Sequence, residues 1–236
     1  MKDIKNNTVW LLLLSLIGLT GVLPVSTRAA DPVLTTVAEV RALTAAEAGK
    51  HYPVKLKGVV TFYDDGLFLR FIQDDTAGIY LNVTNALALK PGQLVEVEGV
   101  TDPGEFAPVV KPTTVKVVGT ANLPVAKPVT LQELLSGAED SQMVQISGEV
   151  RAVRYDNSMG NYFLEVVMGG ERFTAYSRKL PVADPEQLVE SEVKVRGVCS
   201  TLFNRLRQLF GFRLLVPREA DLVIERPAPP DRKSVV

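Results

Sequence analysis

The segment 201–213, TLFNRLRQLFGFR, is the part of the sequence whose residue types are best suited to bind a ligand. Its basic residues are Arg205, Arg207 and Arg213, and they are interleaved with the apolar residues Phe203, Leu206, Phe210 and Phe212. Guanidinium groups pair with phosphates and carboxylates, and aromatic rings stack on bases and sugars. The segment could therefore hold single-stranded nucleic acid, an anionic glycan or a lipid headgroup. The alternative is a short amphipathic helix or hairpin that packs its apolar side chains against the other of the chain's two repeated modules and leaves the arginines in solvent.

A second group of aromatic residues lies between positions 62 and 80. In a strand, successive side chains point to opposite faces, so Phe62 differs in face from Tyr63, and Phe68 differs in face from Phe71. We expect one member of each pair to point into the core and the other outward. The candidate ligand-binding residues from both segments are Phe68, Phe71, Tyr80, Phe203, Arg205, Arg207, Phe210 and Arg213.

The remaining reactive residue types form no catalytic constellation in the sequence. The aspartate pairs at 64–65 and 74–75 precede Gly or Thr, which is typical of hairpin turns, and their spacing does not match a calcium loop. The single histidine, His51, is too few for a histidine-rich metal site. The single cysteine, Cys199, lies in an apolar run and is predicted to be buried. The sequence also has no phosphate-binding loop and no G-x-S-x-G motif. We therefore predict no catalytic residues, no metal ligands, no cofactor and no enzymatic activity.

Charge is nearly balanced over the chain. The 236 residues include 26 Lys and Arg against 27 Asp and Glu, for a net charge of −1, and 46% are hydrophobic. This composition is typical of a protein with one or two globular domains. It excludes nucleic-acid binding through overall basicity, so a site for a polyanion must be local.

The first 30 residues have the features of an export signal. Lys2 and Lys5 precede a mostly apolar run over 9–25, and small residues around Ala29 suit cleavage by a signal peptidase. We therefore expect a cleaved signal peptide over 1–30 and a periplasmic or secreted protein. The alternative is an uncleaved amino-terminal membrane anchor, because the apolar run approaches the roughly 20 residues that span a bilayer. Membrane contact is expected only through such an uncleaved leader.

The rest of the chain contains one pattern twice. VKLKGVVTFYD at 54–64 matches VQISGEVRAVRYD at 144–156, and VEVEGV at 95–100 matches VKVRGV at 193–198. Each copy is preceded by a Thr and Glu at the spacing of a capping box, which are Thr36 with Glu39 and Thr130 with Glu133. A short helix is therefore expected before each copy.

Alternation of apolar and polar residues predicts five strands in each copy. In the first copy they lie near 53–63, 67–73, 78–83, 93–101 and 108–118, and in the second near 142–155, 161–168, 171–177, 191–201 and 213–225. Gly58 and Gly148 allow the long first strand to bend. We predict an all-β protein of two tandem five-stranded OB-type Greek-key barrels, with a plain β-sandwich as the alternative. The expected boundaries are 31–120 for the first barrel, 121–128 for a linker, 129–226 for the second barrel and 227–236 for a flexible tail.

Three stretches also resemble a known family. LTTVAEVRAL at 34–43, PVKLKGVVTFYDDG at 53–66 and LFLRFIQDDTAGIYLNV at 67–83 are similar to OB-fold input regions outside the membrane in bacterial sensor histidine kinases. The resemblance is weaker over 130–226. In those receptors a membrane helix and a kinase domain follow, whereas this sequence ends in a proline-rich, charged tail. The resemblance implies the fold, export and a binding or sensory role, but no kinase activity. A similar strand-turn sequence motif occurs in OB domains of secreted nucleases.

Two hypotheses for function follow. The first is an exported, non-enzymatic ligand-binding or sensory input module for signal transduction, with an envelope protein or membrane receptor as partner. Its ligand would lie on one barrel or between the barrels, which could close around a semi-rigid linker containing Pro124 and Pro128. The second is a secreted accessory domain that binds a polyanion or glycan, such as single-stranded nucleic acid or polysaccharide, through the second barrel. Strong salt dependence would distinguish the second hypothesis from the first.

Overall fold

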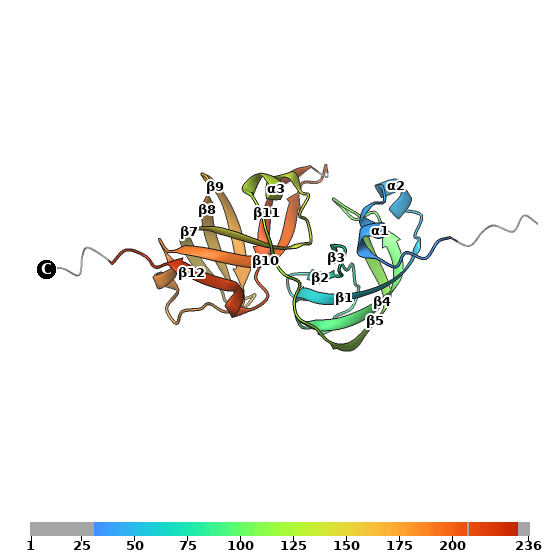
Figure 1. The fold of residues 1–236 in the computed structure, drawn as a ribbon, viewed down its shortest axis with the longest axis horizontal. Coiled ribbons are helices and arrows are strands. Elements are labelled where there is room, and N and C mark those ends of the chain that lie inside the picture. The colour runs from blue at the N-terminus through green and yellow to red at the C-terminus, as the bar shows by residue number, and fades with distance from the viewer. Residues whose placement is uncertain (1–30, 207, 231–236) are drawn as a thin grey trace, which may run out of the picture. The chain divides into compact units, whose positions relative to one another are not determined.

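The computed structural model describes residues 31–206 and 208–230, and these are mostly β-structure in one sheet of five strands and one of seven (Figure 1). The predicted signal peptide, Arg207 and residues 231–236 lie outside the described residues. Within the described part, no helix has the length and apolar character needed to cross a membrane.

Both predicted capping boxes are present. Thr36 Oγ1 accepts a hydrogen bond from Glu39 N at 3.3 Å, and Glu39 Oε2 accepts one from Thr36 N at 2.9 Å. Thr130 and Glu133 form the same pair of bonds in the second copy. Thr44 opens a further short helix that the sequence analysis missed. The helices are α1 (Val37–Arg41), α2 (Ala45–Ala48) and α3 (Leu131–Ser136).

The first sheet contains the five strands predicted for the first copy. They are β1 (Pro53–Asp64), β2 (Leu69–Gln73), β3 (Gly78–Tyr80), β4 (Gln93–Asp102) and β5 (Val109–Thr120). Their order is β3-β2-β1-β4-β5, and all neighbours are antiparallel. An isolated parallel bridge between Leu81 and Val110 joins the chain after β3 to β5. Strand β2 begins two residues later than predicted because Phe68 adopts a left-handed backbone with φ of 54°.

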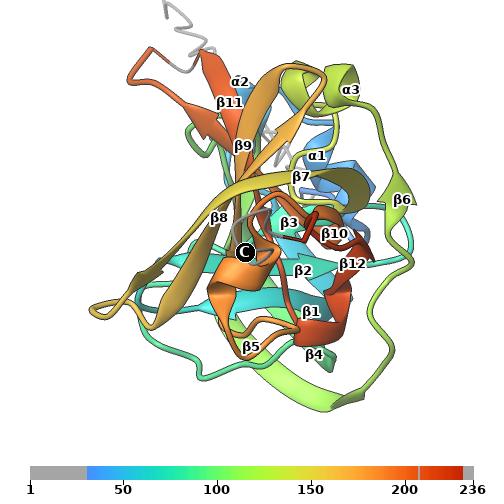
Figure 2. The same cartoon turned by 90° about the vertical axis from the view of Figure 1, so that its left-hand side faces the viewer.

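The second sheet has seven strands where five were predicted. They are β6 (Lys127–Pro128), β7 (Met143–Asp156), β8 (Asn161–Met168), β9 (Glu171–Ser177), β10 (Glu192–Phe203), β11 (Leu209–Leu215) and β12 (Leu222–Arg226). Strands β7, β8 and β9 form an antiparallel meander (Figure 2). Strand β10 pairs with β7, β11 and β12, and β11 pairs in parallel with β9.

The predicted final strand at 213–225 is wrong, because the chain forms β11 and β12 separately. Pro217 lies between them and has no N–H to donate to a ladder. Arg218 then donates from Nε to Asp221 Oδ2 at 2.8 Å, next to the short 3₁₀ helix η2 (Glu219–Asp221). A second 3₁₀ helix, η1 (Pro185–Leu188), lies between β9 and β10. Strand β6 lies within the segment predicted as the linker and pairs in parallel with β7.

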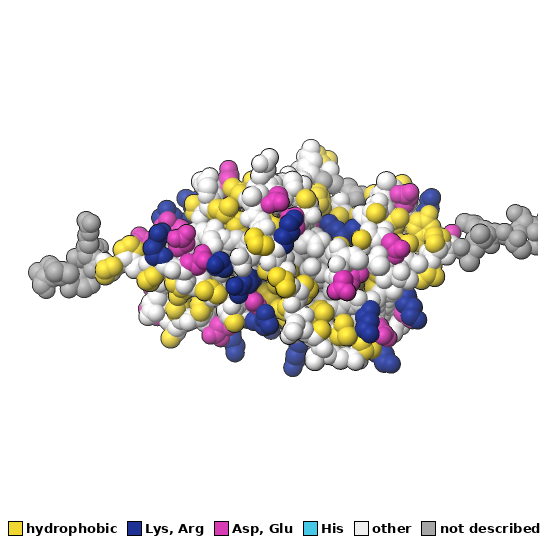
Figure 3. Space-filling view, viewed as in Figure 1, with side chains coloured by type: hydrophobic (Ala, Val, Ile, Leu, Met, Phe, Trp, Pro, Cys, Tyr) yellow, Lys and Arg dark blue, Asp and Glu magenta, His cyan; other side chains and the backbone are white. Residues whose placement is uncertain are grey.

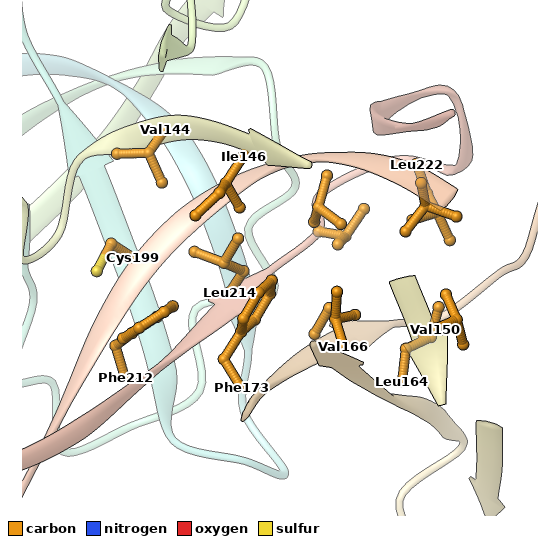
Figure 4. Packing of buried hydrophobic residues seen from close by; sticks show 14 of the residues in the cluster. Val144, Ile146, Val150, Leu164, Val166, Phe173, Cys199, Phe212, Leu214 and Leu222 are labelled. Carbon is orange, nitrogen blue, oxygen red and sulfur yellow. The ribbon is translucent and has the colours of Figure 1, made fainter. Parts of the chain in front are cut away.

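Each sheet encloses its own apolar core. The core of the second sheet is shown in Figure 4 and includes Val144, Ile146, Val150, Leu164, Val166, Phe173, Cys199, Phe212, Leu214 and Leu222. Alternation along β10 directs Val193, Val195 and Cys199 into this core, so the predicted burial of Cys199 is confirmed. The core of the first sheet includes Val54, Leu56, Val60, Ile72, Ile79, Leu81, Val95 and Val97.

A third apolar cluster, here called the intersheet cluster, contains side chains from both sheets. Its buried members are Phe62, Leu69 and Phe71 from the first sheet and Met143, Val198 and Leu215 from the second. Two hydrogen bonds run beside it, from Met143 N to Gln73 Oε1 at 2.9 Å and from Gly78 N to Gln142 Oε1 at 3.1 Å. The sheets are therefore packed directly on each other, within one compact unit that begins at Asp31.

A close backbone approach between Gly78 and Ser141 predicts a specific destabilising substitution. A Cβ added at Gly78 would overlap the carbonyl oxygen of Ser141. We expect Gly78→Ala to lower the free energy of unfolding by about 1–3 kcal/mol, as overpacking in a rigid interior does, measured by urea denaturation. Gly119→Ala is the matched control, because a Cβ there meets nothing within 4 Å. Equal stability of the two variants would contradict this account of the intersheet contact.

Candidate functional site

A pocket of about 340 Å³ lies where the two sheets meet. Its aromatic lining is Phe68, Phe71, Tyr80, Phe106 and Phe203. Its polar lining is Asn82, Glu105, Asp140, Ser141, Ser200, Thr201 and Arg213. Two other hollows, of about 470 and 690 Å³, have no aromatic side chain among their described lining residues. Apolar walls with a few converging polar groups are typical of small-molecule sites, and volumes of roughly 300–1,000 Å³ are usual for them.

Strands β2 and β3 position the aromatic wall contributed by the first sheet. Phe71 and Tyr80 are cross-strand neighbours, and their rings meet edge to face at 5.4 Å. Tyr80 donates a hydrogen bond from its hydroxyl to the carbonyl oxygen of Phe68 at 2.9 Å. This bond, together with the left-handed backbone of Phe68, fixes the end of the β1–β2 turn beside the pocket.

The Phe68 ring is 67% exposed although it lines the pocket. The guanidinium of Arg70 lies 5.3 Å from the centre of this ring, in the range of a cation–π contact. Arg70 is itself held by Asp65, which accepts a hydrogen bond from Arg70 Nε at 2.9 Å. An exposed aromatic ring in a fixed position provides a stacking surface for a ligand.

Asp64 has a role that the sequence analysis missed. Asp64 Oδ1 accepts from Leu67 N at 3.2 Å, as expected for a turn residue. The residue is also only 4% exposed, and Asp64 Oδ2 accepts hydrogen bonds from Arg178 Nη2 at 2.8 Å and Asn161 Nδ2 at 3.5 Å. Asp64 therefore forms a charge-assisted link between the first sheet and the second.

The second sheet contributes Phe203 at the end of β10. The Phe203 ring is parallel to the ring of Phe106, with centroids 6.2 Å apart and an interplanar angle of 6°. Phe106 lies in the loop 103–108, which follows β4 in the first copy, and Phe203 ends β10, the equivalent strand of the second copy. The sequence analysis named no candidate residue in this loop, although the repeat makes the loop equivalent to the segment that contains Phe203.

The polar side of the pocket is built around Arg213 on β11. Arg213 Nε donates to Ser200 Oγ at 3.3 Å, and the guanidinium lies 5.3 Å from the Tyr176 ring. Thr201 is also in this wall, is 6% exposed, and has an Oγ1 with no hydrogen-bond partner among the described residues. A buried hydroxyl without a partner is uncommon and costs stability.

The carboxylate of Asp140 is already neutralised by its neighbours. Asp140 Oδ2 accepts from Arg41 Nη1 at 3.2 Å and from Ser141 Oγ at 3.0 Å. Asp140 Oδ1 accepts from Thr201 N at 3.2 Å. Asp140 thus fixes β10 against the chain before β7, and its charge is compensated by Arg41.

The structure brings together five of the eight candidate binding residues. Phe68, Phe71, Tyr80, Phe203 and Arg213 line the pocket. Arg205 and Phe210 do not line it, and Arg207 lies outside the described residues. In the two aromatic pairs, Phe62 and Phe71 are buried as expected, but their side chains enter the intersheet cluster and not the core of their own sheet. Tyr63 is half-buried, and burial raises its pKa.

Residues 203–206 and 208–213 belong to the β10–β11 hairpin. Asn204 N donates to Gln208 O at 2.9 Å across the turn. Phe212 packs in the core of the second sheet, whereas Leu206 is 77% exposed and Phe210 is 66% exposed. The hairpin was one of the two structures expected for this segment, but two of its apolar side chains face solvent and do not pack against the protein.

The described part of the chain holds no clustered metal ligands, and its His and Cys residues have structural surroundings. No cluster of three or more His, Cys, Asp or Glu residues there could hold a metal ion. His51 Nδ1 lies 3.0 Å from the carbonyl oxygen of Thr101, at the start of β1. Cys199 is fully buried, and this burial raises the pKa of its thiol well above the usual range.

Comparison with known proteins gives no family assignment. No family model matches the chain, and no curated protein matches it. Among solved structures, the chain is similar to an aspartyl-tRNA synthetase from Entamoeba histolytica, at 18% identity over 44% of this chain and 22% of that one, with a TM-score of 0.33. It is also similar to the Ifi202 HINa domain in complex with 20-bp double-stranded DNA, at 8% identity over 76% and 98% of the chains, with a TM-score of 0.33.

The chain thus spans about a fifth of the length of that synthetase. TM-scores of this size support no inference about fold or function. The resemblance to sensor-kinase input regions remains a prediction from the sequence motifs.

The buried thiol gives a prediction about reactivity. The thiolate is the reactive form, and a raised pKa lowers its fraction at pH 8. We expect the folded full chain to react with a disulfide reagent such as DTNB roughly 100-fold more slowly than the same chain in urea, because reaction then requires local opening. Cys199→Ser, which removes the only thiol, is the control for background. Equal rates in buffer and in urea would show that Cys199 is accessible.

Proposed function

We propose that the protein is an exported, non-enzymatic binding module of two tandem OB-type barrels, which holds a small ligand in the pocket between them. Both sheets contain the same five-strand pattern of pairing, which supports two equivalent barrels. In the first, β1 pairs with β2 and β4, and in the second, β7 pairs with β8 and β10. In the first copy the chain after β3 also bridges in parallel to β5, and in the second copy β9 pairs in parallel with β11. This is the strand connection expected for an OB-type Greek-key barrel.

The observation that carries the proposal is the convergence of candidate residues from both copies on one pocket. OB-type barrels bind ligands on the face of strands two and three and in the loops after strands one and four. The pocket uses these parts of the first copy, through Phe71, Tyr80, Phe68 and Phe106. The equivalent loop of the second copy supplies Phe203 as the facing wall.

The contacts between the sheets favour a preformed pocket over closure around the linker. The intersheet cluster is buried, and separating the sheets would expose its six large apolar side chains to water. It would also leave Asp64 without its partner Arg178. Burying each large apolar side chain is worth about 1.5–3 kcal/mol, so such an opening would be costly. This replaces the sequence-based expectation that the two barrels close on the ligand.

Export and sensing are proposed on the sequence alone. The charged-then-apolar leader supports a periplasmic or secreted location, and the motifs at 34–83 support an input role. In that role the ligand-bound module would act on an envelope protein or a membrane receptor. No reaction is required of any residue.

The test is thermal unfolding of the full chain with a panel of small organic acids, nucleotides, oligonucleotides and glycans at low and moderate salt. A ligand raises the unfolding midpoint by mass action. Phe203→Ala removes one wall of the pocket, so we expect it to lose most of the ligand-induced shift, measured from its own ligand-free midpoint. Phe210→Ala is the matched control, because this ring is on the same hairpin but outside the pocket, and we expect its shift to match the wild type.

The exposed hairpin supports the second candidate, a polyanion-binding accessory domain. Arg205, Leu206 and Phe210 are exposed together near its turn, and basic and aromatic side chains of this kind bind single-stranded nucleic acid or glycans. Elsewhere, basic and acidic side chains are interspersed over the face shown in Figure 3. If an oligonucleotide or polyanionic glycan stabilises the protein, salt removes the effect, and Phe210→Ala loses it while Phe203→Ala keeps it, the pocket proposal is overturned in favour of this candidate.

A further inference from the structure

We infer that the ligand of this pocket is a small organic anion with a flat apolar body, whose carboxylate or phosphate group is held by Arg213. The inference rests on the proposed function, because it specifies the ligand of the same pocket. It rests on a difference between two charged side chains in the pocket wall: Asp140 is paired with Arg41, whereas Arg213 has no ion pair among the described residues.

Arg213 is half-buried and has no counter-ion among the described residues. No carboxylate of the described residues lies within 4.0 Å of its guanidinium nitrogens. Its only hydrogen bond among the described residues is the one from Nε to Ser200 Oγ, so both Nη groups have donors to spare. A partly desolvated cation is costly without a counter-charge, and guanidinium binds carboxylate or phosphate through two parallel hydrogen bonds.

One carboxylate of the pocket wall is already engaged by other groups. Asp140 is paired with Arg41 and accepts two further hydrogen bonds, from Ser141 Oγ and Thr201 N. Glu105 also lines the pocket, but it is exposed and forms no ion pair with Arg213. The positive charge of Arg213 is therefore available to a ligand.

One hydroxyl group accompanies Arg213. Ser200 lies opposite Arg213 in the register of β10 and β11, and its oxygen accepts from Arg213 while its own proton has no acceptor among the described residues. An oxygen of a bound anion would accept this hydrogen bond and satisfy the donor.

The rest of the pocket suits a flat apolar group. Phe203 and Phe106 present parallel rings, and Phe68 is fixed at the opening by its backbone and by Tyr80. Aromatic faces of this kind stack on planar groups. A volume of about 340 Å³ admits a two-ring compound together with its anionic substituent.

Three probes that share one naphthalene body separate the possible charges of the ligand. They are 2-naphthoate, its neutral amide 2-naphthamide, and the cation 2-naphthyl-trimethylammonium, each titrated into the full chain by calorimetry or ligand-observed NMR. We expect the wild type to bind the carboxylate roughly tenfold or more tightly than the amide, because charge-assisted hydrogen bonds are about twice as strong as neutral ones.

Variants assign the preference to Arg213. Arg213→Gln keeps hydrogen-bonding capacity without charge, so we expect it to bind carboxylate and amide equally. Arg213→Lys keeps the charge without the planar fork and should restore part of the preference. Arg205→Gln is the matched control, because Arg205 is on the same hairpin and outside the pocket, and it should bind as the wild type does.

The outcomes separate this inference from the proposed function. The wild type could bind amide and carboxylate equally, and Phe203→Ala could lose the binding of both. The pocket would then bind a ligand, but the inferred preference for an anion would be wrong. Tightest binding of the cation would show an aromatic cage and would also overturn the inference. If none of the probes binds at millimolar concentration, both the inference and the proposed pocket function fall. A carboxylate preference that survives Arg213→Gln would place the anion site elsewhere.

Discussion

The packing of the two sheets against each other is the constraint on which the rest of the structure depends. The intersheet cluster buries three large apolar side chains from each sheet, and no part of the pocket would have a second wall without it. Phe71 shows the dependence directly, because its side chain belongs to this cluster and also lines the pocket. Stability and binding geometry therefore rest on the same contact.

Polar groups at this contact are paired, which makes it specific as well as apolar. Gln73 accepts a hydrogen bond from the backbone N–H of Met143, and Gln142 accepts one from the backbone N–H of Gly78. Each bond crosses from one side of the contact to the other. Asp64 is buried and retains its charge partner, Arg178, at 2.8 Å. A buried carboxylate that lost this partner would be strongly destabilising, because its desolvation would remain uncompensated. These pairs are satisfied in the observed placement of the sheets, so they favour it over a placement that leaves the same groups unpaired.

Local patterns in the sequence predicted local structure well. The capping boxes at Thr36 and Thr130 and all five strands of the first sheet follow from side-chain chemistry within a few residues, and the structure confirms them. The predicted strand at 213–225 was wrong because hydrophobic alternation continued across Pro217, which breaks the ladder.

Contacts between distant segments could not be predicted in the same way. Alternation showed that one of Phe68 and Phe71 is buried, but it cannot identify the surface that buries it, and for Phe71 this is the other sheet. Phe106 was missed for the same reason, since its only signal is the repeat that makes its loop equivalent to the one with Phe203. The buried link from Asp64 to Arg178 also joins segments far apart in the chain, and a turn motif explains Asp64 without it.

The repeat also explains how one pocket arises from two copies of the same module. Phe71 and Tyr80 pair across β2 and β3, and Phe163 and Tyr176 pair across β8 and β9, with edge-to-face rings in both cases. In the first copy the pair lines the pocket. In the second, Arg213 lies over Tyr176 and faces the pocket from the other side. The same aromatic pair thus serves as a binding wall in one copy and as a support for the cation in the other, so the copies differ in chemistry although they share a strand pattern.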